Sequence, residues 1–167
     1  MNTQLSTANL AVQLFTLRNF LKTKADFARS LERIKGIGYP AVQISAVGAM
    51  TGDNPEVDAK QARQMLDDNG LKCIATHRPW ESLLENTEFE IEFHQILGCD
   101  FVAIGGAPTV NQNAGAEGYI AWVREALPLV EKLKSAGSGS ATIITLLSLS
   151  GFSAGQAVAL APFSTLS

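Results

Sequence analysis

Short apolar runs alternate with segments of helical periodicity along most of the chain. The apolar runs are rich in β-branched residues, which is typical of strands. Strands alternating with helices at this interval of about 30 residues indicate βαβ units and a parallel sheet. The predicted strands are LAVQLFTL from Leu10, AVQISA from Ala41, LKCIAT from Leu71 and DFVAIGG from Asp100.

Between the strands, apolar side chains recur at the three- and four-residue spacing of a helix face. A first helix with Phe27, Leu31 and Ile34 on one face is predicted to end at Gly36 and Gly38. The second is predicted over about residues 57–68, with an end signal at residues 69–70. The third is predicted to start near residues 86–87 and to stop at Gly98. The fourth contains Pro128, which predicts a kink or a late start. Its expected apolar stripe is Ile120, Val123, Leu127, Val130 and Leu133.

Residues 10–136 therefore contain four βα units, half of the eight in a closed (β/α)8 TIM barrel. The predicted fold class is α/β, of the TIM-barrel type, with only the first four units encoded. An open four-unit sheet is the alternative, but no GxGxxG or GxxxxGK[ST] loop follows the first strand. Because ligands bind at the carboxyl ends of parallel strands, function is sought in the loops that follow them. These loops are 16–18, 45–51, 77–81 and 105–108.

Four residues near these strand ends are candidates for binding a substrate. Gln13 and Gln43 occupy matching places in AVQLF and AVQIS, either as hydrogen-bonded interior glutamines or as the polar wall of a sugar pocket. His77 directly follows the third strand, where an imidazole can donate to hydroxyls, transfer protons or bind metal. Trp80 either stacks on a sugar face or packs a lid. His94, in the middle of a predicted helix, is interpreted as structural.

A catalytic set is not apparent from the residues alone. The acidic side chains near the strand ends are Asp53, Glu81 and Glu85, and they form no metal-binding pattern with a histidine. The chain carries 13 Lys+Arg and 16 Asp+Glu, and a net charge of −3 argues against a nucleic-acid partner. Cys73 and Cys99 are interpreted as reduced thiols, and the first residues lack the basic region of a signal peptide. We therefore expect a cytoplasmic protein without a membrane partner.

All the charged residues lie between Arg18 and Lys134, so the last 33 residues contain none. Soluble domains distribute charge over their surface, and this ending is therefore unlike the rest of the chain. The sequence predicts two parts, a half barrel over residues 1–137 and a charge-free tail over 138–167.

Four segments resemble the sugar phosphate isomerase/epimerase family, whose xylose isomerase-like TIM barrel is shared with endonuclease IV. The segments are AVQLFTLR, LERIKGIGYPAVQIS, QARQMLDDNGLKCIATHRPWESL and LGCDFVAIGG, and the resemblance covers residues 10–137. It implies a metal-dependent isomerase or epimerase that abstracts a proton next to the carbonyl of a sugar, keto-sugar or inositol-like polyol. It also implies a divalent metal (Mn, Mg, Co or Zn), with ligands mostly from strands five to eight. Gln13, Gln43 and His77 match pocket positions, although many relatives carry Glu where Gln43 stands.

Such relatives continue after KLKSAG with a fifth strand, whereas this chain continues with SGSATIITLLSL. In a shifted reading frame, each new codon consists of the last base of one original codon and the first two bases of the next. Residues 137–149 can then spell Ile-Arg-Phe-Gly-Tyr-His-Asn-His-Ala-Phe-Glu-Phe, which is like the expected strand. The hypothesis is that the tail is an out-of-frame reading of strand five onward, natural or from a sequencing error. The alternatives are a membrane anchor over residues 141–163 and a flexible tail.

Two functions remain open at this point. If the tail is out of frame, the chain is the inactive first half of an isomerase or epimerase, because the family's metal ligands are missing. The other hypothesis is a non-catalytic half barrel that binds a polyol or self-associates through its open sheet edge. Action on DNA, which the fold also supports, is disfavoured by the net charge.

Overall fold

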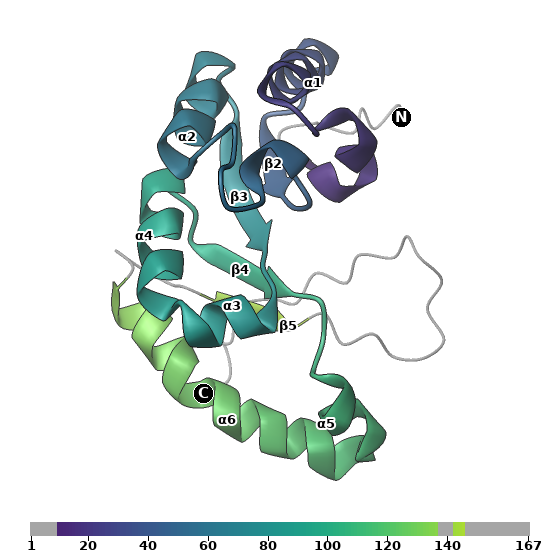
Figure 1. Cartoon of the computed structure of the whole chain (residues 1–167), viewed down its shortest axis with the longest axis vertical. Coiled ribbons are helices and arrows are strands. Elements are labelled where there is room, and N and C mark those ends of the chain that lie inside the picture. Colours follow the sequence, from purple (N-terminus) through teal and green to yellow (C-terminus); the bar gives the residue numbers. More distant parts are fainter. Residues whose placement is uncertain (1–9, 137–141, 146–167) are drawn as a thin grey trace, which may run out of the picture. The chain divides into compact units, whose positions relative to one another are not determined.

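A computed structural model of the chain describes residues 10–136 and 142–145 (Figure 1). The described residues form two compact units. The first contains residues 10–77 and 92–99, and the second contains the remainder. The predicted boundary at Gly137 and the tail, apart from residues 142–145, lie outside the described residues.

The first unit is a parallel sheet in the order β1 (Ala11–Gln13), β2 (Ala41–Ile44) and β3 (Lys72–His77). Each pair of strands is joined by a helical crossover, as a parallel connection requires. The helical elements of this unit are η2 (Leu14–Phe20), α1 (Lys24–Ile37), η3 (Gly48–Met50), α2 (Ala59–Asp68) and the second part of α4 (Thr87–Leu97). The first three predicted strands and the first three predicted helices are thus confirmed, with the ends shifted by a few residues.

One face of this sheet packs against the helices. Val42 and Ile44 of β2 share a buried cluster with Phe27 and Leu31 of α1 and Leu66 of α2. Burial of such side chains stabilises a fold by about 1.5–3 kcal/mol each. The helices therefore cover the side of the strands on which Val42 and Ile44 lie.

The first strand is shorter than the predicted LAVQLFTL, because the chain leaves the sheet after Gln13 and forms η2. The hydroxyl of Thr16 donates to the carbonyl oxygen of Gln13, with an oxygen–oxygen distance of 2.8 Å. Hydrogen bonds from Ser and Thr side chains to nearby backbone groups compete with strand pairing, and here the Thr16 bond accompanies a 3-10 turn. The prediction of a strand to Leu17 was wrong for this reason.

The second unit contains β4 (Phe101–Ile104) and β5 (Thr142–Thr145), which pair in parallel. Thus the fourth predicted strand is confirmed, and a fifth strand lies beside it. The helices of this unit are α3 (Trp80–Glu85), the start of α4, α5 (Thr109–Asn113) and α6 (Gly115–Ala136). Buried side chains of α3 and α6 form a second cluster with Val102 and Ile104. No helix of the described ranges combines the length and apolar character needed to cross a membrane.

Helix α6 buries only part of the predicted stripe. Leu133 lies in the cluster and Val130 is partly buried, whereas Ile120, Val123 and Leu127 are exposed. The cluster also contains Trp122 and Leu129, which the predicted stripe leaves out. Successive residues turn by about 100° around a helix, so Ile120 and Leu129 point in opposite directions. The helix carries apolar side chains on both sides, and spacing alone identified the buried side only in its last turns.

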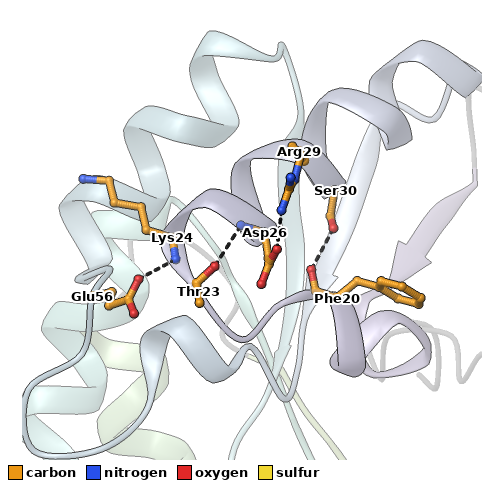
Figure 2. A network of polar contacts seen from close by, with 7 residues as sticks. All are labelled: Phe20, Thr23, Lys24, Asp26, Arg29, Ser30 and Glu56. Carbon is orange, nitrogen blue, oxygen red and sulfur yellow. Dashed lines mark hydrogen bonds and ion pairs between the residues drawn. The ribbon is translucent and has the colours of Figure 1, made fainter.

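A polar network fixes the start of α1 (Figure 2). The Thr23 hydroxyl accepts a bond from the backbone N–H of Asp26 at 3.1 Å, which is the geometry of a helix N-cap. The backbone N–H of Lys24 donates to a carboxylate oxygen of Glu56 at 2.7 Å, although Glu56 is distant in sequence. The Ser30 hydroxyl donates to the carbonyl oxygen of Phe20. The bond from Lys24 to Glu56 joins the loop before α2 to the first turn of α1, and the bond from Ser30 to Phe20 joins α1 to the end of η2.

We predict that Thr23→Ala lowers the free energy of unfolding by about 1 kcal/mol, because the N–H of Asp26 loses its acceptor. Thr23→Ser, which keeps the hydroxyl, is the matched control and should be close to wild type. Urea denaturation of the three proteins measures the difference. Equal stability of the alanine and serine variants would contradict the cap.

Candidate functional site

The two candidate glutamines lie side by side on the sheet face away from the helices. Gln13 and Gln43 are register partners in neighbouring parallel strands. Because side chains alternate along a strand, they point away from Val42 and Ile44, which pack against the helices. Gln13 is exposed and Gln43 is partly buried. The predicted match between AVQLF and AVQIS is therefore a spatial match.

A β-bulge brings His77 to the same face. Val42 pairs with Cys73, but the next residue of β2, Gln43, pairs with Ala75, so that Ile74 is an extra residue in β3. Ala75 therefore shares the face of Gln43, and His77, two residues later, shares it as well. Gln13, Gln43 and His77 come together on one face at the carboxyl ends of three strands.

The environment of His77 favours its neutral form. The side chain is partly buried, and desolvation lowers the pKa of the imidazole from its ordinary value of 6.5. A neutral imidazole offers one hydrogen-bond donor and one acceptor, and each glutamine amide offers both kinds of group. The three side chains thus provide an uncharged polar surface suited to hydroxyl groups.

The loop after β2 contains a strained residue near this face. Ala46 has φ of 51°, in the left-handed region that residues with a side chain rarely adopt. The preceding residue, Ser45, is almost fully buried. Strain of this kind is concentrated at functional sites, and the loop is one of those singled out from the sequence. Spacing and composition gave no signal for it.

Trp80 is placed differently from the other three candidates. It belongs to the second unit, where its side chain is 6% exposed and packs in the buried cluster. Its ring meets that of Trp122 edge to face, with 5.4 Å between the ring centroids. This geometry fits the packing alternative for Trp80, and stacking on a sugar face stays a prediction.

Two polar pairs that sequence reasoning missed hold the residues on either side of His77. Within the first unit, the hydroxyl of Thr76 and Nε2 of His94 are 2.6 Å apart, and both side chains are buried. Within the second unit, Arg78 forms two hydrogen bonds with the carboxylate of Glu90, at 2.7 and 2.5 Å. Glu90 is 1% exposed, so its charge is buried against that guanidinium.

A divalent metal site would need several His, Cys, Asp or Glu side chains close together. Among the described residues, no group of three or more His, Cys, Asp or Glu side chains could hold a metal ion. His77 is one imidazole on the candidate face, whereas zinc sites in proteins use three or four protein ligands. The described residues alone therefore do not fit the metal that the family resemblance implies. The two cysteines are free and buried, and a hydrogen bond to Cys99 together with burial raises the pKa of the Cys73 thiol.

No protein-family model matches the sequence, and no curated protein matches it. Solved structures do match. A protein from Sinorhizobium meliloti 1021 superposes with a TM-score of 0.60 at 15% identity, over 84% of this chain and 50% of that one. A xylose isomerase domain containing protein from Salmonella typhimurium LT2 gives 0.53 at 11%, over 80% and 47%. An AP endonuclease, family 2, from Brucella melitensis gives 0.53 at 14%, over 81% and 53%.

The chain has the fold of the xylose isomerase-like TIM barrels. The resemblance noted in the sequence is thereby confirmed at the level of the fold. The chain spans about half the length of the barrel proteins it matches. In xylose isomerase-like barrels, as in other TIM barrels, the carboxyl ends of the strands face the ligand. Gln13, Gln43 and His77 occupy such ends in this chain.

We predict that His77 destabilises the fold at acid pH. Its pKa is lower in the folded chain than the ordinary 6.5, so the unfolded chain binds more protons once the pH falls below about 6.5. The free energy of unfolding should therefore fall through this range, and part of the fall should be absent in His77→Asn. Thermal unfolding at a series of pH values measures the difference between the two proteins. A constant difference from pH 8 to pH 4 would contradict the lowered pKa.

Proposed function

We propose that residues 10–136 form the first half of a sugar isomerase- or epimerase-type barrel and that their polar face binds a sugar, keto-sugar or polyol. The observation that carries this proposal is the alignment of Gln13, Gln43 and His77 on one face at the carboxyl ends of parallel strands. The fold alone leaves the chemistry open, because one fold supports many reactions. The proposal therefore rests on these side chains.

The chemistry of the three side chains supports a hydroxylated, uncharged ligand. Adjacent sugar hydroxyls each need a donor and an acceptor, which two amides and a neutral imidazole supply together. A phosphate or carboxylate ligand would instead favour an arginine or lysine, which hold such groups by charge-assisted bonds. The one lysine of β1, β2 and β3 is Lys72, which shares this face through its pairing with Ala41 but lies at the amino end of β3, away from His77.

Binding should depend on the amide of Gln43. We expect Gln43→Ala to weaken the binding of myo-inositol or D-xylose by about tenfold, because one hydrogen-bonding group at the site is lost. Gln64→Ala is a matched control, since Gln64 lies on the exposed surface of α2 and bonds to Asp68. Titration calorimetry or NMR shift titration gives the dissociation constants. Binding that is equal in all three proteins would place the ligand elsewhere.

We further propose that this chain does not turn over a sugar by itself. Proton abstraction next to a carbonyl needs a base and a group that stabilises the resulting oxyanion. His77 is the one ionisable side chain that β1, β2 and β3 place on this face at their carboxyl ends, and the described residues provide no ligand set there for the cation that the resemblance implies. Assays of ketose–aldose exchange and epimerisation with Mn²⁺, Mg²⁺, Co²⁺ or Zn²⁺ added should show no activity. Metal-dependent turnover by the purified chain would overturn this part of the proposal.

The residues after Gly137 are proposed to be an out-of-frame reading of the fifth strand onward. In the shifted frame, the codons of residues 141–145 can spell Tyr-His-Asn-His, so that the segment of β5 would carry two imidazoles in place of Thr142–Thr145. That change would add two imidazoles, a type of metal ligand, to the histidines already present in the described residues. The gene sequence across codons 134–150 tests the idea. Codons that cannot spell this motif in the shifted frame would refute it.

A further inference from the structure

Two buried polar groups meet behind the face that carries His77. Thr76 is fully buried and His94 is 7% exposed, and the hydroxyl lies 2.6 Å from Nε2 of the imidazole. Thr76 pairs with Ile44 of β2, whose side chain is in the cluster under the helices. The Thr76 side chain therefore points to the helix side, and His77 points to the opposite side.

Leaving a buried hydroxyl or a buried imidazole without a hydrogen-bond partner costs free energy. The contact between Thr76 and His94 therefore opposes rotation of either side chain. The bulge lies close to this pair, since the extra residue Ile74 is two positions before Thr76. A strand that contains a bulge is locally less constrained by its ladder, and a side-chain bond next to it compensates for this. The Phe93 ring packs edge to face against the imidazole of His94 and restricts it further.

We propose that His94 is a positioning residue: by holding Thr76 from α4, it fixes the direction in which the neighbouring His77 leaves β3 toward the ligand. The part of this inference that concerns the ligand rests on the proposed function. The positioning of His77 by Thr76 and His94 does not depend on it. The residue after His77 is held in a similar way, since Arg78 is bonded to Glu90, one helical turn before His94 in α4. Helix α4 thus carries partners for both neighbours of His77.

The chain has two histidines, so the imidazole region of an NMR spectrum contains two sets of signals, and His94→Gln leaves that of His77 alone. The variants are His94→Gln, Thr76→Val, which removes the hydroxyl at nearly constant shape, and Thr76→Ser, which keeps it. For each we would record the titration of His77, the binding of myo-inositol and the thermal unfolding midpoint. The matched control is Thr87→Val, because Thr87 lies on α4 and its hydroxyl bonds to the carbonyl oxygen of Leu83.

We expect His77 to titrate closer to pH 6.5 in Thr76→Val and His94→Gln, because a ring that is no longer held becomes more accessible to water. Myo-inositol binding should weaken by about tenfold, which is the lower end of the loss seen when the outer partner of a metal-binding histidine is removed. Thr76→Ser should restore both properties, and Thr87→Val should leave both unchanged.

The outcomes separate the inference from the proposed function. If wild type does not bind myo-inositol but the His77 titration still moves in Thr76→Val and returns in Thr76→Ser, the proposed ligand is wrong and the positioning stands. If the unfolding midpoint falls in Thr76→Val while the His77 titration is unchanged, the pair is merely structural and the inference is overturned. Should Thr76→Val fail to fold, an unchanged His77 titration in His94→Gln would overturn it equally.

Discussion

The structure of the first unit depends on the alternation of side chains along parallel strands. In β2, Val42 and Ile44 enter the cluster beneath the helices, which leaves Gln43 on the other face. Burial of the apolar side chains stabilises this choice, because a shift by one residue would bury the amide and expose the two aliphatic groups. The position of the polar face is therefore a consequence of core packing. Any function of that face depends on how the core side chains pack.

The elements that the sequence predicted correctly are those with a local signal. The four strands have β-branched runs, and α1 ends at Gly38, whose φ of 103° suits glycine. The matching of Gln13 with Gln43 also follows from local pattern, because similar strands in successive βα units align in similar register. For α6, periodicity identified Leu133 but not Trp122 and Leu129, since apolar side chains lie on two sides of the helix and the buried side depends on what lies beside it. Periodicity failed for η2 because a hydrogen bond from Thr16 competes with the strand.

The polar pairs of α4 show a second limit of sequence reasoning. His94 and Glu90 lie in an otherwise amphipathic helix, and nothing in the spacing reveals that their partners are Thr76 and Arg78. A buried carboxylate is costly unless it is paired, so Glu90 becomes understandable only once the guanidinium is located. Such pairs specify a geometry more than they add stability. In this chain they hold the residues before and after His77.

The bulge in β3 decides whether His77 belongs to the candidate face at all. Starting from Cys73, which lies in the cluster under the helices, strict alternation would turn residue 77 to the helix side as well. The extra residue Ile74 reverses this order, so Thr76 takes the buried place and His77 the polar one. Neither glycine nor proline marks the bulge in LKCIATH, and the sequence alone therefore could not locate it. The buried bond between Thr76 and His94 is satisfied only in the bulged register, and so it stabilises the arrangement that presents His77.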